Sequence, residues 1–200
     1  MATLPPVLKS RKHHWKARAM LNKEFREIFS AEIISMTGGL LAGSILAAYI
    51  NKILLIPGLL ILLPGFLEMR GNISGSLAAR LGTALDLKKI PIKIDGSKVV
   101  SKNIAATFIE ALAVALSLAL VAYVITYFVF GTATLEIFLI AIIAALLANV
   151  IEATLTVYTT FWLFRKGHDP NNIMGPYVTT TGDIVSVVSL LVAIAVIAWI

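Results

Sequence analysis

Long apolar stretches dominate the chain and are separated by short polar segments. Five of them are long enough to form membrane-crossing helices: residues 28–50, 53–69 with a helical continuation to 85, 104–130, 135–164 and 176–200. A spanning helix needs about 20 mostly apolar residues. The alternation of apolar and polar positions that marks exposed strands is absent. The pattern therefore predicts an all-α integral membrane protein with five transmembrane helices.

The second apolar stretch is irregular. As one straight helix, residues 53–85 would measure about 50 Å, which exceeds the hydrocarbon core of about 30 Å. Helix-interrupting residues also recur along it, namely Pro57, Pro64, Gly65, Gly71 and Gly75. We therefore expect this second helix to be kinked or broken. A broken helix at membrane depth is tolerated where it is buried in protein or lines a cavity.

Composition supports the membrane assignment. The chain of 200 residues is 58% hydrophobic and 14% charged, whereas soluble domains are about 45–50% apolar and about 25% charged. This composition excludes an ordinary soluble domain and a disordered chain. The sequence holds no cysteine, which excludes disulfides, thiolate metal sites and cysteine nucleophiles.

The basic residues predict the orientation in the membrane. They cluster before the first span and in the segments between spans two and three and between spans four and five. Short loops rich in Lys and Arg stay cytoplasmic, so the N-terminus is predicted inside and the C-terminus outside the cell membrane. The net charge of +6 is interpreted as anchoring to the lipid bilayer, with no nucleic-acid partner.

Two regions follow from this pattern. Residues 1–27 are predicted to be a basic cytoplasmic segment, with an amphipathic helix at 11–27 that presents Trp15, Leu21 and Phe25 to the interface. Residues 28–200 form the five-helix transmembrane domain. In its first span, Gly39 and Gly43 are four residues apart, a spacing that favours close helix packing.

Polar residues inside the spans are the candidates for function, because ionisable groups in lipid are costly. Five carboxylates qualify, each in a polar stripe at helical spacing: Glu32, Glu68, Glu110, Glu152 and Asp183. Hydrogen bonding between helices remains an alternative explanation for these stripes. Asp183 is the strongest candidate, because its span holds no basic residue; Arg80 is the deep cation that could neutralise it.

The ligand types indicate which ion would bind. In the second helix Glu68, Asn72, Ser76 and Thr83 fall on one face, and in the fifth Asn172, Pro176, Thr179, Asp183 and Ser186 align. Carboxylate, amide and hydroxyl oxygens suit Mg²⁺, Mn²⁺ or Ca²⁺. Because Mg²⁺ sheds water reluctantly, a site with few carboxylates favours a hydrated ion.

Two motifs carry a family resemblance. Residues 64–72 (PGFLEMRGN) with 77–83 (LAARLGT), and residues 169–172 (DPNN) with 179–183 (TTTGD), are similar to the second-helix and fifth-helix signatures of the MgtE and solute carrier 41 family. The resemblance covers about residues 28–200. It implies a Mg²⁺-permeable channel or transporter, with Asp183 on the pore axis of a homodimer and Asp169 at the cytoplasmic mouth.

The predicted site combines this resemblance with the polar stripes. The metal-binding candidates are Asp183, Thr179, Asn72, Asp169, Asn172 and Gly175. Further pore-facing candidates are Glu68, Ser76, Thr83, Asn171, Ser186 and Glu152.

The predicted function is a divalent-cation channel, most simply for Mg²⁺, with no resident cofactor. Helices two and five would line the pore of a homodimer, because the chain shows no internal duplication. The alternative is a secondary transporter or exchanger coupled to Na⁺ or H⁺ at the same site. We expect no enzymatic activity, since clustered aspartates for metal catalysis are lacking. About 27 residues precede the first span, so gating by the large sensing domains of bacterial MgtE is not expected.

Overall fold

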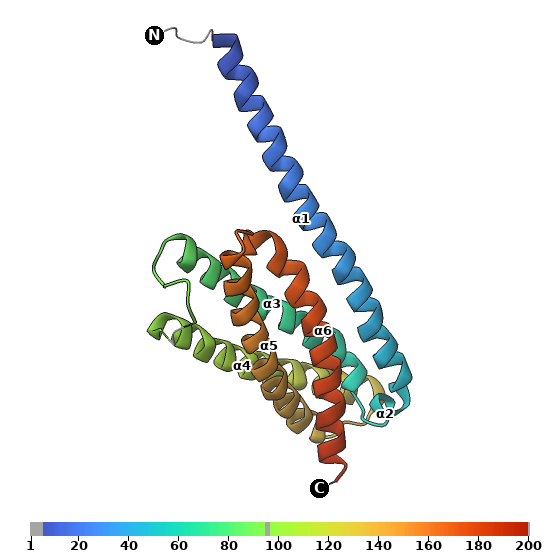
Figure 1. Cartoon of the computed structure of the whole chain (residues 1–200). Helices are drawn as coiled ribbons and strands as arrows, with labels where there is room; N and C mark the ends of the chain where they lie inside the picture. The colour runs from blue at the N-terminus through green and yellow to red at the C-terminus, as the bar shows by residue number, and fades with distance from the viewer. Residues whose placement is uncertain (1–5, 95–96, 200) are drawn as a thin grey trace.

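A computed structural model describes residues 6–94 and 97–199, with side chains in the first helix from residue 25 onward. The described chain is helical throughout, as the sequence predicts (Figure 1). The helices are α1 (Pro6–Ala48), α2 (Ile50–Leu54), α3 (Leu59–Asp86), α4 (Lys98–Phe130), α5 (Glu136–Arg165) and α6 (Pro170–Ile197).

Four helices are long and apolar enough to cross a membrane, whereas five spans were predicted. They are residues Phe25–Ala48 of α1, and α4, α5 and α6. Helix α3 does not belong to this set, although its 28 residues exceed the length of a span. The physical reason is its charge, because Glu68, Arg70, Arg80 and Asp86 all lie within it.

The expected break in the second apolar stretch lies near its start. Helix α2 ends at Leu54, and α3 begins at Leu59 after Gly58, whose φ of 85° is a conformation that favours glycine. Helix α3 then continues through Pro64, Gly65, Gly71 and Gly75 as one element. The predicted kink within this helix is therefore not confirmed.

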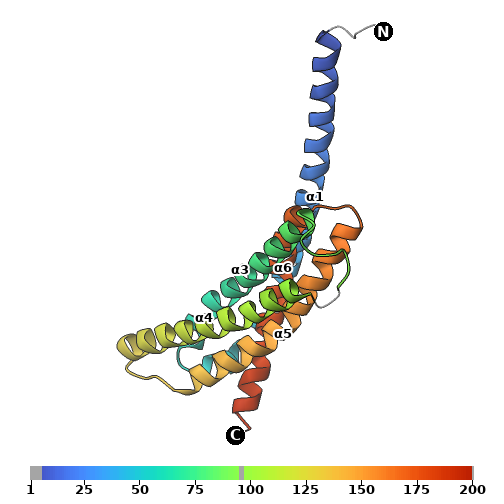
Figure 2. The same cartoon turned by 90° about the vertical axis from the view of Figure 1, so that its left-hand side faces the viewer.

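Helix α1 unites two predicted elements. The segment expected to form a separate amphipathic helix at residues 11–27 and the first span form one helix of 43 residues. Its N-terminal part extends beyond the bundle, and the chain's C-terminus lies at the opposite end (Figures 1 and 2). The predicted anchors Trp15 and Leu21 lie outside the described side chains, while Phe25 is exposed.

Helix α6 is the centre of the bundle. It packs against α1, α3 and α5. Helix α4 packs against α3 and α5. The shared core contains many alanines, including Ala111, Ala115, Ala141 and Ala144. Small side chains let helix backbones approach closely and pack well in a membrane. The C-terminal helix is thereby held on three sides.

The close contact between α1 and α6 is made by Gly38, not by the predicted pair Gly39 and Gly43. A β-carbon built on Gly38 would collide with the Thr180 methyl group, whereas at Gly39 and Gly43 it would meet no other atom within 4 Å. Gly39 and Gly43 have the four-residue spacing that favours helix packing, but this pair points away from the bundle.

Candidate ion pathway along helices α3 and α6

Helices α3 and α6 run antiparallel and in close contact. A β-carbon built on Gly71 would lie 3.5 Å from Thr179 Oγ1, and one built on Gly82 would lie 3.5 Å from Asn171 Oδ1. Because residue numbers rise along one helix as they fall along the other, the two predicted polar stripes lie side by side. The glycines of α3 thus bring the polar residues of the two helices together.

The two stripes share one open face. On α3, Glu68, Asn72, Ser76 and Thr83 are exposed; on α6, Gly175 and Thr179 are exposed, and Asn172 and Asp183 are partly exposed. The Asn72 amide donates a hydrogen bond to Glu68 Oε1 at 3.3 Å. Glu68 and Asp183 lie close enough to interact electrostatically. The structure therefore brings most of the predicted site onto one oxygen-rich surface, here called the α3–α6 face.

The start of α6 places two further candidates. Asp169 is the N-cap, and its Oδ1 accepts hydrogen bonds from the Asn171 backbone N–H at 2.9 Å and from the Asn171 side-chain amide at 3.0 Å. Pro170 occupies the first turn, where the missing N–H is not needed. Asp169 and Asn171 remain exposed, so the carboxylate is both a helix cap and a charge at this end of the α3–α6 face.

Pro176 modifies the middle of α6. It lies inside the helix and has no N–H, so the Asn172 carbonyl lacks its usual helical donor. The hydroxyls of Thr179, Thr180 and Thr181 each donate to the carbonyl four residues earlier, at 3.1, 2.9 and 3.0 Å. The polar half of α6 is thus a modified helix with one backbone oxygen released.

Two of the predicted pore-facing residues lie elsewhere. Glu152 and Ser186 are both fully buried inside the bundle. Glu152 Oε2 accepts a hydrogen bond from Thr181 at 3.4 Å, and the described residues offer Oε1 no hydrogen-bond partner. Glu152 therefore lies in the interior of the bundle, where it also interacts electrostatically with Arg70 and Asp183.

Arg70 is the residue that sequence reasoning missed. It is fully buried, and its guanidinium donates to Asn149 Oδ1 at 3.1 Å and to the Ala145 carbonyl at 3.2 Å. Asn149 in turn donates to Thr107 Oγ1 at 3.1 Å, which links α3, α5 and α4. The guanidinium also interacts electrostatically with Glu152.

A sequence signal for this burial exists. Phe66, Arg70, Ile73 and Leu77 follow one another at steps of four, three and four, and all four are buried. Arg70 therefore occupies the apolar face of α3, the position from which a charge points inward.

The cation expected near Asp183 makes a different ion pair. Arg80 Nη1 lies 3.6 Å from Glu110 Oε1, and both side chains are more than a third exposed. This pair joins α3 to α4, so Glu110 has a structural partner. The buried positive charge nearest the C-terminal helix comes from Arg70, whose Cγ would lie 3.1 Å from a β-carbon on Gly182.

The ligand chemistry of the α3–α6 face fits a hard cation that keeps its water. Within the described residues, no group of three or more His, Cys, Asp or Glu side chains could hold a metal ion. The face instead offers the carboxylates of Asp183 and Glu68 with amide and hydroxyl oxygens nearby. Such sparse ligation is typical of hydrated Mg²⁺, whereas Ca²⁺ takes about six to eight oxygen ligands.

Comparison with known proteins finds a matching family and related sequences. Residues 63–193 match the sequence model of the MgtE family, described as a divalent cation transporter. The human and Xenopus laevis proteins named solute carrier family 41 member 2 are each 25% identical to this chain over 144 residues. These matches cover 70% of this chain and 24% of each relative, so the chain spans about a quarter of their length. No solved structure matches the chain.

Proposed function

Because the chain belongs to the MgtE family of divalent cation transporters, we propose that it conducts Mg²⁺ along the α3–α6 face, which a second copy closes into a pore. The observation that carries this proposal is the juxtaposition of two polar stripes on an otherwise apolar protein. An exposed row of carboxylate, amide and hydroxyl groups is unfavourable against lipid. Water and ions along the face would remove that penalty.

A two-fold homodimer explains why the face is open in a single chain. Pairing the face with its own copy would enclose the polar residues of both chains and double the number of oxygen ligands. Two Asp183 carboxylates would then repel each other across the axis, and an ion of charge +2 would relieve that repulsion better than Na⁺ or K⁺. Retained water would bridge the ion to Thr179 and Asn72.

In this arrangement α3 crosses the membrane as a fifth helix beside the four apolar ones. Glu68 would face the pore, whereas Arg70 donates to Asn149 and to the Ala145 carbonyl of α5, and Arg80 pairs with Glu110 of α4. The basic segments before α1, between α3 and α4 and between α5 and α6 would lie in the cytoplasm. Asp169 would then stand at the cytoplasmic mouth, where an exposed carboxylate raises the local cation concentration.

An ion-coupled transporter is the second candidate, and Glu152 is the observation that favours it. A fully buried carboxylate with one unpartnered oxygen is a group that could bind a proton or Na⁺ during a transport cycle. Its bond to Thr181 connects it to the helix that carries Asp183. A channel needs no such second site.

The test is transport by purified protein in liposomes. Asp183→Asn should fold and dimerise normally but lose Mg²⁺ flux or its selectivity over monovalent ions, because the charge is lost at constant size. Glu110→Gln is the matched control, since it removes a carboxylate that pairs with Arg80 away from the face. Wild-type flux and selectivity in a well-folded Asp183→Asn protein would contradict the assignment.

The same liposomes separate the two candidates. A channel passes Mg²⁺ current without any gradient of Na⁺ or H⁺. A coupled transporter stops when the coupling ion is withdrawn, and Glu152→Gln should then abolish its ion dependence.

A further inference from the structure

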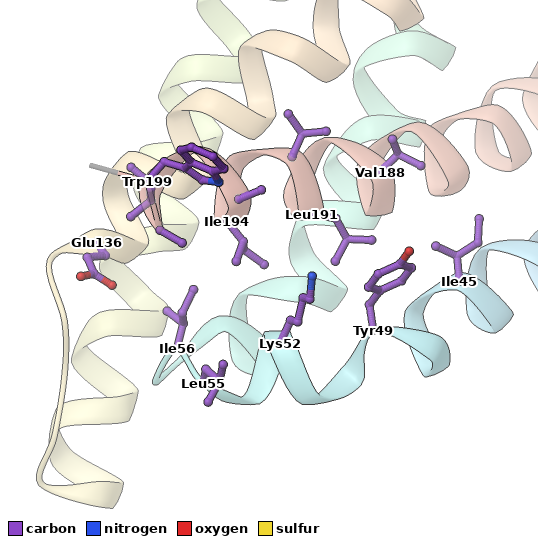
Figure 3. Close-up of a pocket in the computed structure, with 14 residues that line it drawn as sticks. Ile45, Tyr49, Lys52, Leu55, Ile56, Glu136, Val188, Leu191, Ile194 and Trp199 are labelled. Atoms are coloured by element: carbon purple, nitrogen blue, oxygen red, sulfur yellow. The ribbon is translucent and has the colours of Figure 1, made fainter.

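A groove of about 860 Å³ lies at the end of the bundle where the chain terminates (Figure 3). Its walls come from the end of α1, from α2 and the segment after it, from the last turns of α6 and from Glu136 at the start of α5. They are mostly apolar, with Ile45, Ile56, Leu191 and Ile194 among them. The volume lies within the range of sites that bind small molecules, about 300–1,000 Å³. The groove continues from the α3–α6 face toward the end of α6, since its lining residue Val188 lies one to two turns after Asp183.

Lys52 places a positive charge in this groove. Figure 3 shows its side chain extending from α2 toward Leu191 and Ile194 of α6. Its ammonium nitrogen lies 5.6 Å from the centre of the Tyr49 ring, and no carboxylate among the described residues lies within ion-pair distance of it. Lys52 is exposed, so its ammonium group can pair with an anion from outside the chain.

The flanking residues place this charge at a membrane boundary. Helix α1 ends at Ala48 and α6 at Ile197, so two apolar helices end beside the groove. Tyr49 and Trp199 both line it, and Trp199 is 91% exposed. Tyrosine, tryptophan and lysine are typical of the level at which lipid headgroups begin. In a bilayer that ends at this level, the apolar walls would face acyl chains and Lys52 would lie at the depth of lipid phosphates.

We infer that this groove is a binding site for a membrane phospholipid, whose phosphate pairs with Lys52 and whose acyl chain lies against α6. A phospholipid satisfies both halves of the groove at once, the unpaired cation and the apolar walls. Free phosphate would use only Lys52, and a second copy of the chain packed on the apolar walls would leave the ammonium unpaired. The inference does not rest on the proposed transport function.

Trp199 supplies a direct reporter of occupancy. Replacing Trp15 and Trp162 by Phe leaves it as the single tryptophan of the chain. Phosphatidylglycerol with brominated acyl chains, which quench tryptophan fluorescence on contact, is titrated into this protein in detergent. We expect saturable quenching at low lipid-to-protein ratios, since the acyl chain would lie beside the indole ring.

Four variants decide between the explanations. Lys52→Met should weaken lipid binding about tenfold or more, because a charge-assisted contact is lost, and Lys52→Arg should retain it. Lys102→Met removes another exposed lysine, which lies outside the groove, and should have no effect. Ala195→Phe, which fills the groove from α6, should reduce saturable quenching while the protein stays folded.

Several results would overturn the inference. Linear, non-saturable quenching would show only that the lipid mixes into the detergent around the protein. An equal loss of lipid binding in the Lys52→Met and Lys102→Met proteins would show a nonspecific charge effect. Competition by inorganic phosphate as strong as that by lipid would assign the site to a free anion. If position 199 cross-links to a second chain and added lipid does not prevent the cross-link, the groove is an interface between copies.

Discussion

Gly38 offers the sharpest test of how α6 is positioned. A β-carbon at this residue would collide with the Thr180 methyl group and lie 3.3 Å from Thr180 Cβ. Thr180 cannot move away freely, because its χ1 rotation is restricted by β-branching and its hydroxyl donates to the Pro176 carbonyl at 2.9 Å. Gly38→Ala must therefore separate α1 from α6 or distort Thr180.

The expected change in the free energy of unfolding is the sum of two opposing contributions. Overpacking costs about 1–3 kcal/mol, while alanine stabilises a helix interior over glycine by about 0.5–1 kcal/mol. Gly39→Ala is the matched control, because a β-carbon there meets no other atom within 4 Å and only the second term applies. The two variants differ by the packing term alone, so Gly38→Ala should be less stable than Gly39→Ala by about 1–3 kcal/mol.

Thermal unfolding in detergent measures this difference. For a chain of this size, about 1–3 kcal/mol corresponds to a midpoint lower by about 2–12 °C. Adding Thr180→Ser to the Gly38→Ala protein removes the colliding methyl group and should restore most of the loss. Equal midpoints for the two alanine variants would refute the packing of α1 on α6. If Gly39→Ala were instead the damaging variant, the outward glycines would belong to an interface between copies.

Two other residues give simple predictions. Arg70→Met should lower the free energy of unfolding by about 3 kcal/mol or more, because it leaves Asn149 and Glu152 without their buried cation. Arg70→Lys should lose less, and an unfolding midpoint unchanged in the methionine variant would contradict the network. Asp169→Asn should keep the helix cap and its stability, whereas Asp169→Ala should cost about 1 kcal/mol. Reduced Mg²⁺ flux at low salt in a stable Asp169→Asn protein would support a mouth role, and flux equal to wild type at every salt concentration would refute it.

The helices could be predicted well from the sequence because apolar runs of spanning length have few alternatives in a membrane. Helix α5 lies within one residue of its predicted limits, and α4 ends at the predicted Phe130 but begins at Lys98, six residues before the predicted start. The start of α6 was placed six residues late, at Pro176. Pro170 occupies the first turn, capped by Asp169, and Pro176 lies within the helix.

Within the candidate site, prediction succeeded where a polar face continues along one helix. The stripe from Glu68 to Thr83 needed only helical periodicity. The alignment of α3 with α6 could not be deduced in the same way, because it depends on which glycine meets which neighbour. Glu152 shows the limit most clearly: it was recognised as a carboxylate inside a span, but its direction, toward the bundle interior, is set by packing.

The three consecutive threonines of α6 explain why contacts with several other helices affect the position of Asp183. Thr179 lies beside Gly71 on the α3–α6 face, Thr180 meets Gly38 of α1, and Thr181 donates to Glu152 of α5. Three neighbours thus fix the rotation of α6 about its own axis within a single turn. Asp183 is one turn further along, so any change at these contacts that rotates α6 must also change how far its carboxylate projects from the face. Residues that never touch an ion, Gly38 among them, should therefore affect transport through the orientation of this helix.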